Sequence, residues 1–547
     1  MRKPSSVWKI LSLLAGAAWL ARLSLGCRSQ AVLRDDPAAN RVRNVILVIG
    51  DGMGPQQIAL ANLYARHAPH SVVPDRRLHL DALMNEGQVG LSSTEPADGL
   101  VNDSAGSATQ IATALPSRPG MIGVDASGNR AETVLEKAKR AGYATGLVSN
   151  VRITDATPAA FAAHRPYRYQ EPEIAEDLLA AAPDVMLSGG LRSFLPAQVN
   201  EPGSAVREAW RARLPASFRL ESRRADERDL VAQARDLGYA VVFDGDGLAG
   251  ARGARLLGLF ASGAMPDALA MRRARAEPGR SVPTMVEMTR AALERLASSS
   301  KGFFLMVEAG GQIDWAGHDN DAGDLLQEML DFDETLGAIR AWMDEHPETL
   351  LVVTADHETG SFGFSYSRWQ IPGGLALAGA TLGGKTFQSE FNFGDPAVLD
   401  QLHEQRQSFG ELLDEFDTLP ESERTPATLR ERFNALSRFP ITIQDAATVL
   451  ATEPNTSYVP GHRYLDEQTF PRVRDFKEFY VDPPRARAAL LGRAIARQQG
   501  IVWGTGTHTS TLVLAIAAGP PAWTRRFAGL HHETEIGRVV AEALALD

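Results

Sequence analysis

The sequence has almost no cysteine: Cys27 is the only one among its 547 residues. A single cysteine cannot form an internal disulfide, so the stability of the folded chain must come from packing and bound ligands. Positive charge is not in excess either, because 56 Lys and Arg stand against 67 Asp and Glu, for a net charge of -11. This balance gives no general electrostatic reason to bind nucleic acid or anionic lipid, and no nucleic-acid-binding surface is evident. Internal repeats and low-complexity tracts are also absent.

The amino terminus has no apolar run long enough to cross a bilayer comfortably. The run Ile10 to Ala21 follows several basic residues and has the length of a secretory signal. We therefore predict that residues 1–27 form a signal or lipoprotein leader and that the chain is exported, to a periplasm in a bacterium. Cys27 directly follows Gly26, as at a bacterial lipoprotein cleavage site, which predicts a lipid anchor; ordinary signal cleavage beside a chance cysteine is the alternative.

The rest of the chain, residues 28–547, has the composition of a globular protein, with 44% hydrophobic and 22% charged residues. Apolar runs alternate with helical patterns, which is typical of an α/β fold with a largely parallel sheet. The expected strands are 44–50, 143–149, 184–188, 303–307, 349–354 and 512–518. Residues 191–300 have a mostly helical pattern, and 303–354 has the strand–helix–strand order of a parallel pair. The alternation weakens over 361–500, which predicts a helical or irregular, cap-like insertion.

Candidate metal ligands follow four of the apolar runs directly. They are Asp51, Asp155 with Thr157, Glu308, and Asp356 with His357. The carboxyl ends of parallel strands lie along one edge of a sheet, where α/β proteins bind ligands, so these side chains are expected to meet. Asp314 and His318 stand four residues apart, which brings them to one side of a helical turn. So many carboxylates at one edge require cations, and the mixture of imidazole, carboxylate and hydroxyl suits zinc and magnesium.

Within the stretch Val101 to Gln110, Ser104 stands at the start of a segment of small residues with a helical pattern. The amino terminus of such a helix favours an anion, so it could bind phosphate or stabilise an alkoxide. The simpler interpretation is that Asp103 or Ser104 caps the helix. The segment alone favours the cap.

Eight motifs, taken together and in order, resemble the alkaline phosphatase family. They are Asp51-Gly-Met-Gly54, Asp103-Ser104-Ala105, Thr154-Asp155-Ala156-Thr157-Pro158-Ala159-Ala160, Ala163-His164 with Arg168 four residues on, Val307-Glu308, Ile313-Asp314 with His318, Thr354-Ala355-Asp356-His357, and Gly506-Thr507-His508-Thr509. The resemblance implies a three-layer fold, with a largely parallel central sheet between helices, in a catalytic domain spanning 28–547. It also implies hydrolysis of small phosphomonoesters, and it admits a homodimer.

The resemblance further implies a role for each matching residue. Ser104 would be the nucleophile that becomes phosphorylated, and Arg168 would bind the phosphoryl oxygens with its planar guanidinium. One zinc ion would be held by Asp314, His318 and His508, and a second by Asp51, Asp356 and His357. A magnesium ion would share Asp51 and take Thr157 and Glu308, with Asp155 close by or acting through water.

Two departures from the family pattern bear on the magnesium site. Trp315 stands where well-known members carry Lys or His, and the interval from Glu308 to Asp314 is one residue longer than usual. We expect a bulge at Gly310-Gly311 to absorb the extra residue, so that Glu308 still faces the magnesium. A phosphodiesterase or sulfatase of the same superfamily and a non-catalytic phosphate- or metal-binding lipoprotein are the alternatives. The surroundings of Cys27 and Ser104 do not match a sulfatase motif.

Overall fold

The core of the protein is a ten-stranded sheet, and the apolar runs form its centre. The computed structural model describes residues 41–216, 218–275 and 280–546. The strand order is β18 (Gly529–His532), β2 (Gln88–Ser93), β17 (Val513–Ala518), β8 (Thr349–Thr354), β1 (Asn44–Ile49), β7 (Phe303–Glu308), β3 (Ala144–Arg152), β4 (Val185–Gly189), β6 (Arg255–Leu259) and β5 (Tyr239–Val242). Only β17 is antiparallel to its neighbours, β8 and β2; the other paired strands in this sheet are parallel. The predicted α/β class is confirmed.

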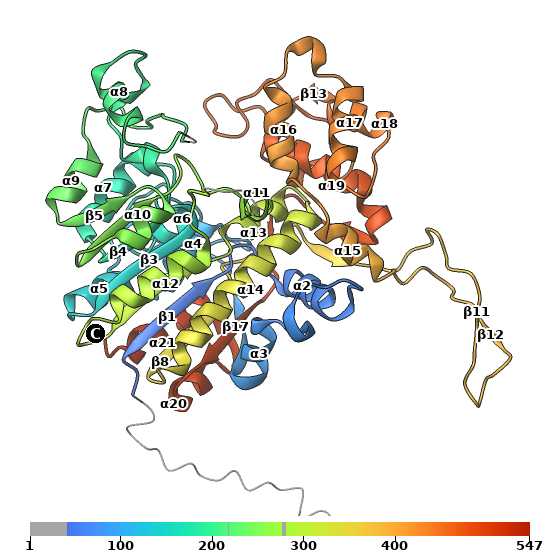
Figure 1. Ribbon diagram of the computed structural model, residues 1–547, viewed down its shortest axis with the longest axis horizontal. Helices are drawn as coiled ribbons and strands as arrows, with labels where there is room; N and C mark the ends of the chain where they lie inside the picture. The colour runs from blue at the N-terminus through green and yellow to red at the C-terminus, as the bar shows by residue number, and fades with distance from the viewer. Residues whose placement is uncertain (1–40, 217, 276–279, 547) are drawn as a thin grey trace, which may run out of the picture. The chain divides into compact units, whose positions relative to one another are not determined.

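Helices cover both faces of the sheet, which explains why its central strands are apolar without alternation. In β1, Ile46 and Val48 belong to the core on one face, whereas Val45, Leu47 and Ile49 belong to the core on the other. The first face is covered by α2 (Pro55–His67), α3 (His79–Glu86), α12 (Met285–Leu296), α13 (Gly311–His318) and α14 (Ala322–Asp344), and the second by α4 (Ser104–Thr113), α5 (Val134–Arg140), α6 (Ala156–Ala159), α7 (Glu171–Ala181), α9 (Leu230–Asp236) and α21 (Glu533–Ala543). Figure 1 shows α12 and α14 lying along the sheet. The three-layer arrangement is confirmed.

Residues 361–500 combine helices with short strands and long irregular segments. The elements of this region are β10 (Phe362–Phe364), β11 (Leu375–Ala376), β12 (Thr386–Phe387), α15 (Ala397–His403), α16 (Phe409–Asp417), α17 (Pro426–Leu436), α18 (Ile443–Val449), β13 (Thr452–Pro454), β14 (Thr469–Pro471) and α19 (Pro483–Gln499). In α16, the buried side chains Phe409, Leu412, Leu413 and Phe416 recur at helical spacing. α19 packs against both α16 and α13, so the region adjoins the helix that carries Asp314 and His318.

Smaller elements complete the described chain. They are α8 (Ala205–Arg211), α10 (Gly245–Gly250), α11 (Ala268–Arg275), α20 (Pro521–Thr524), β9 (Glu358–Thr359), β15 (Ile501–Trp503) and β16 (His508–Thr509), with short 3-10 turns between them. Among the described residues, no helix is both long and apolar enough to cross a membrane. The predicted leader and Cys27 lie outside the described residues.

The structure differs from the sequence-based expectation in four respects. The stretch 191–300 contributes strands β5 and β6 as well as helices. Strands β18 and β2, the first and second at one side of the sheet, carry too few apolar residues to be recognised. β7 and β8 are parallel, as predicted, but they are not neighbours, because β1 lies between them and pairs with both. The expected bulge at Gly310-Gly311 is also absent: β7 ends at Glu308 and α13 begins at Gly311.

Candidate metal and phosphate site

Four neighbouring parallel strands bring the predicted ligands to one edge of the sheet. The strands lie in the order β8, β1, β7, β3. Asp356 follows the end of β8, Asp51 follows β1, Glu308 is the last residue of β7, and Asp155 follows β3. The register pairs Ile49 with both Glu308 and Thr354, so these ends are level with one another. Convergence of these side chains therefore follows directly from the topology.

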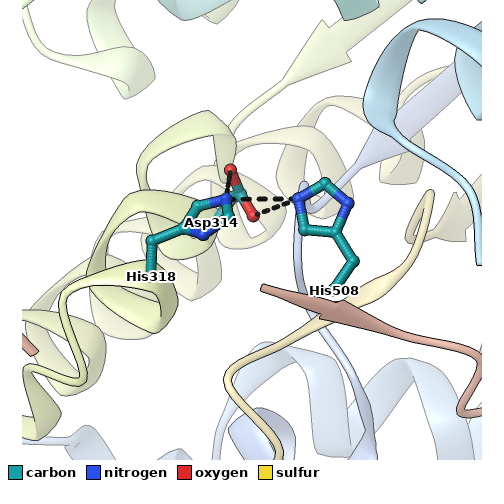
Figure 2. Close-up of side chains that lie close together, drawn as sticks. All are labelled: Asp314, His318 and His508. Carbon is teal, nitrogen blue, oxygen red and sulfur yellow. Dashed lines mark hydrogen bonds and ion pairs between the residues drawn. The ribbon is translucent and has the colours of Figure 1, made fainter. Parts of the chain in front are cut away.

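The first ligand cluster consists of Asp314, His318 and His508, and Figure 2 shows both imidazoles turned toward the carboxylate. Asp314 and His318 lie one turn apart in α13, whereas His508 comes from the short strand β16. Nε2 of His318 lies 3.3 Å from Oδ2 of Asp314, and Nε2 of His508 lies 3.4 Å from Oδ1 of the same carboxylate. The two Nε2 atoms are 3.2 Å apart. Three donor atoms thus face one small space.

Backbone carbonyls fix the orientation of both imidazoles. Nδ1 of His318 lies 2.7 Å from the carbonyl oxygen of Gly506, and Nδ1 of His508 lies 2.9 Å from that of Asn102. A carbonyl can only accept, so Nδ1 carries a proton and donates in each case, which leaves Nε2 as the nitrogen that can bind a metal ion. Metal-binding histidines typically have such a partner on the other nitrogen.

The second ligand cluster consists of Asp51, Asp356 and His357, and all three are buried. Nε2 of His357 lies 3.5 Å from Oδ1 of Asp51 and 3.4 Å from Oδ2 of Asp356. These two carboxylate oxygens are buried and have no hydrogen-bond partner within the described chain. Buried oxygen atoms without a partner are costly, and a cation bound between them would remove that cost. The donor set of this cluster therefore fits a metal ion.

The carboxylates of the two clusters have opposite pKa shifts. In the second cluster, burial and then neighbouring carboxylates raise the pKa of Asp51 well above its ordinary value, and they raise that of Asp356 to about 6. In the first cluster, burial also acts to raise the pKa of Asp314, but His318 and His508 outweigh it and hold the pKa well below its usual range. The first cluster is partly neutralised by its own histidines, and the second is not.

Two contacts connect the clusters. The rings of His357 and His508 are stacked, with centroids 3.5 Å apart and an interplanar angle of 18°. The Thr359 hydroxyl donates to Oδ1 of Asp314 over 2.5 Å and lies 3.3 Å from Nδ1 of His357. Sequence reasoning missed Thr359, although it follows the His357 motif by only two residues.

Glu308 and Thr157 lie beside the second cluster, at the place expected for magnesium. Glu308 is buried at the end of β7, the strand that pairs with β1, and it is one of the carboxylates that raise the pKa of Asp51. Burial raises the pKa of Glu308 itself to about 8, although the Ser149 hydroxyl donates to it over 2.5 Å. The Thr157 hydroxyl is buried and acts to lower the pKa of Glu308, but it makes no hydrogen bond of normal geometry within the described structure.

The additional residue before Asp314 is accommodated in the turn between β7 and α13. Gly310 is the residue before α13, with φ -121° and ψ 23°, and Gly311 is the first residue of the helix. A Cβ atom on Gly311 would approach the carboxyl carbon of Glu308 to 3.1 Å. Because the extra residue lies beyond the strand, Glu308 keeps its strand-terminal orientation and no side chain changes face.

Ser104 is the first residue of α4, and the cap of this helix is Asp103. The Asp103 side chain accepts hydrogen bonds from the backbone N–H groups of Gly106 and Gly120 over 2.9 and 2.8 Å. Because Asp103 does the capping, the Ser104 hydroxyl is available for chemistry. Its Oγ lies 3.3 Å from Nε2 of His357, the atom that faces the carboxylates of the second cluster.

Arg168 lies next to Ser104 and is held by two carboxylates. Its guanidinium contacts Oδ2 of Asp103 at 3.1 Å and Oδ1 of Asp155 at 3.3 Å. Burial acts to lower the pKa of Arg168, but these two carboxylates raise it well above its ordinary value. Asp155 is also bound by Arg152 at 2.5 Å. The structure thus places Asp155 between two arginines, a contact that the sequence did not reveal because Arg152 precedes the motif.

The site opens into a cavity of about 560 Å³. Ser104, Arg168, Asp314, His318 and His508 line it. Trp315, Tyr169, Arg463, Tyr464 and Arg485 also line it, and we call this second set the outer wall because it contains no candidate ligand or nucleophile. Trp315 lies between two arginines, with its ring centroid 5.8 Å from the guanidinium carbon of Arg152 and 5.0 Å from that of Arg485. Arg463, Tyr464 and Arg485 come from the 361–500 region, where the sequence offered no functional signal.

Known proteins with similar sequences are phosphatases. The repressible alkaline phosphatase of Saccharomyces cerevisiae is 37% identical over 62% of this chain and 59% of its own length, and the alkaline phosphatase of Escherichia coli is 33% identical over 60% of this chain and 73% of its own. The chain therefore spans less than two thirds of the length of the yeast relative that it matches.

Solved structures and family-level similarity agree with these relatives. The alkaline phosphatase of Thermus thermophilus superposes with a TM-score of 0.71 at 30% identity, covering 93% of this chain and 92% of that one. The sequence model of the family described as alkaline phosphatase matches residues 42–546. With the ordered motifs gathered at one sheet edge, this match shows that the chain belongs to the alkaline phosphatase family.

Proposed function

We propose that this protein hydrolyses phosphate monoesters through a phosphoserine formed on Ser104, at a site that holds two zinc ions and one magnesium ion. The observation that carries the proposal is the position of Ser104. Its hydroxyl lies at the start of α4, 3.3 Å from a ligand nitrogen of the second cluster, and Arg168 adjoins it in the same cavity. A nucleophile, candidate metal ligands and a phosphate-binding cation thus meet at one point.

The donor sets of the clusters support the metal assignments. The first cluster offers two imidazoles and a carboxylate, a combination typical of catalytic zinc. The second offers one imidazole and two carboxylates and would hold the other zinc ion. The magnesium ion would take only oxygen ligands, from Asp51, Glu308 and Thr157. When bound, the metal ions would lower the pKa of the attacking hydroxyl and polarise the oxygens of the phosphoryl group.

The protein's own residues orient the reaction. Oγ of Ser104 attacks phosphorus as the bond to the leaving oxygen breaks; the hydroxyl gives up its proton to solvent, and the leaving oxygen takes one up to depart as the alcohol. Arg168 presents two N–H groups to the phosphoryl oxygens, while Asp103 and Asp155 hold its guanidinium in place. We assign Asp155 this orienting role in preference to metal binding. A water molecule then attacks the phosphoserine, releases phosphate and restores the Ser104 hydroxyl.

Replacement of the nucleophile tests this proposal. Ser104→Ala should lower kcat for p-nitrophenyl phosphate by about a thousandfold or more, because the covalent step is lost. Ser127→Ala, at an exposed position, is the matched control and should hydrolyse the ester like the parent. Peptide mass spectrometry after acid quenching should find phosphate on Ser104 of the parent.

The result that overturns the nucleophile assignment is parental activity in Ser104→Ala with both metals bound and the fold intact. Bis-p-nitrophenyl phosphate, assayed in parallel, decides between monoester and diester as the preferred substrate. Faster hydrolysis of the diester would make the protein a phosphodiesterase of the same superfamily. Metal analysis of the purified protein should find zinc and magnesium in a ratio of two to one.

Export and lipid attachment remain predictions that rest on residues 1–27. We propose an exported enzyme whose mature amino terminus is a lipid-modified Cys27. Mass analysis of the mature amino terminus should find this residue first and acylated. An unmodified chain that begins elsewhere would contradict the lipid anchor and leave the proposed activity untouched.

A further inference from the structure

The outer wall of the cavity contains an arginine, Arg463, that has no role in the proposed hydrolysis. Arg463 is exposed, lines the cavity and comes from the loop between β13 and β14. Within the described residues it has no ion-pair partner. The other cavity arginines differ in this respect: Arg152 and Arg168 bind Asp155, and Arg485 contacts Oδ2 of Asp319 at 2.7 Å. Arg463 therefore supplies positive charge that remains available to a ligand.

Contacts with two tyrosines hold Arg463 at this place. Its guanidinium carbon lies 3.8 Å from the ring centroid of Tyr169 and 5.7 Å from that of Tyr464. The two tyrosine hydroxyls are hydrogen-bonded to each other, which fixes the β13–β14 loop to the segment that follows Arg168. A guanidinium held over an aromatic ring loses less freedom when it binds an anion than a free side chain does.

The ring of Tyr169 lies near both Arg463 and Arg168, the arginine that we propose binds the phosphoryl group. The guanidinium carbons of Arg168 and Arg463 lie 5.8 Å and 3.8 Å from the same Tyr169 centroid, so they can be no farther apart than these two distances laid end to end. One small molecule can therefore contact both guanidinium groups, with its reacting phosphoryl group at Arg168 and its leaving group at Arg463.

The chemistry of the wall favours an anion over an aromatic group on that molecule. The rings of Tyr169 and Trp315 already have arginine guanidinium groups packed over them. Asp482 also lines the mouth, but it lies near Arg485 and acts on the pKa of that residue. The charge of Arg463 thus remains uncompensated, and the hydroxyls of the two tyrosines lie beside it.

We propose that Arg463, held over Tyr169, binds a second anionic group on the leaving alcohol, so that the enzyme prefers phosphomonoesters that also carry a carboxylate or a further phosphate. This inference rests on the proposed phosphomonoesterase activity. It makes Arg463 a specificity-determining residue that acts on the leaving group and takes no part in the transfer of phosphate.

Three substrates that differ in one substituent test it: phenyl phosphate, 4-carboxyphenyl phosphate and 1,4-phenylene bisphosphate. The ratio of kcat/KM for each anionic ester to that for phenyl phosphate should fall about two- to fivefold in Arg463→Gln, the size expected for a solvent-accessible ion pair. Comparing ratios between variants cancels the different intrinsic reactivities of the esters. The ratio for the bisphosphate should fall more than that for the carboxylate, because its charge is larger.

Arg474→Gln is the matched control, since it removes an exposed arginine from the same region at a position that does not line the cavity. Its ratios should equal those of the parent, and the preference of the parent should weaken as salt is raised. Unchanged ratios in Arg463→Gln, with phenyl phosphate still hydrolysed, would overturn this inference and leave the proposed function standing. If the parent hydrolysed none of the esters, the proposed function would fail, and this inference with it.

Discussion

Both ligand clusters gather charged side chains, but they differ in how the charge of their carboxylates is balanced. In the first cluster the carboxylate of Asp314 faces two imidazoles, and its pKa is lowered. In the second cluster two carboxylates share one imidazole and are wholly buried, so the pKa values of Asp51 and Asp356 are raised. The first cluster is thus stable as a set of protein contacts, whereas the second is complete only with a cation.

Position in the fold explains this difference. The second cluster lies directly on the strand ends β1 and β8, where backbone geometry decides which side chains meet. The first combines a helix with a strand more than 180 residues away, and its two histidines are partly accessible, although Asp314 is buried. Rigid placement makes it possible to bury like charges together, and that burial is a property expected of metal sites.

The largest effect is expected from Asp51→Asn, because Asp51 would serve both the second zinc ion and the magnesium ion. We expect kcat to fall more than about a thousandfold, since several kcal/mol of transition-state stabilisation by the metals is lost. Zinc analysis should show that one ion is lost while the first cluster keeps its own. Retention of both zinc ions would remove the distinction between the clusters.

A smaller loss is expected from Arg168→Lys, which alters neither cluster. Lysine keeps the charge but cannot form two parallel hydrogen bonds to the phosphoryl oxygens, so kcat/KM should fall about a hundredfold. Metal content should remain that of the parent. A fall in zinc content would mean that Arg168, Asp103 and Asp155 support the clusters as well as the substrate.

Thr359→Ala should have a moderate effect on both clusters at once, because the hydroxyl contacts Asp314 and lies near His357. Loss of such a supporting contact should weaken zinc binding about tenfold, which a competition titration with a chelator can measure. Thr456→Ala, at an exposed position, is the control. If only one zinc ion were released more readily, the hydroxyl would support one cluster alone.

The smallest effect is expected in the pH dependence of stability. The folded-state pKa values of Glu308 and Asp356, about 8 and about 6, exceed their ordinary values, so the metal-free native state binds more protons than the unfolded state does. Their stabilising contribution is present below the ordinary pKa values, 4.5 and 3.8, and is lost as pH rises through 6 and 8. The Tm of the metal-free protein should therefore fall by a few degrees between pH 5 and pH 8.5.

Zinc and magnesium should reverse that trend, because bound metal keeps these carboxylates ionised in the native state. The gain in Tm on adding both metals should thus grow with pH. Asp314 has the opposite sign: its lowered pKa stabilises the fold above pH 3.8, and this contribution disappears on acidification. A metal-free Tm that rises from pH 5 to pH 8.5 would contradict the contrast between the clusters.

The sheet centre and the strand-end ligands could be predicted from the sequence because both depend on local signals. The run Phe303 to Val307 is apolar without interruption, which is the pattern of a strand covered on both faces, and Glu308 ends it. The strand order could not be predicted in the same way. Nothing in the residues of β7 and β8 indicates that β1 lies between them, since pairing between distant segments depends on the whole fold.

The outer wall of the cavity was beyond sequence reasoning for a related reason. Arg463 and Tyr464 lie in an exposed loop with no periodic pattern, and their relation to Tyr169 exists only in three dimensions. The same holds for Arg152, whose pairing with Asp155 changes the role assigned to that aspartate. Side chains on strand ends can be located from sequence, whereas contacts between a loop and a distant segment require the structure.

His357 belongs to the second cluster and His508 to the first, and their rings are stacked. The contact distance of two aromatic rings therefore limits how closely these two ligands can approach each other. Neither ring can approach the other more closely, and Nδ1 of His508 is tied to the backbone of Asn102 beside the nucleophile. A metal ion bound in one cluster would therefore restrict the movement of the histidine that belongs to the other. Metal uptake should be cooperative, with the first zinc ion raising the affinity for the second, so that partly loaded molecules are scarce at every metal concentration.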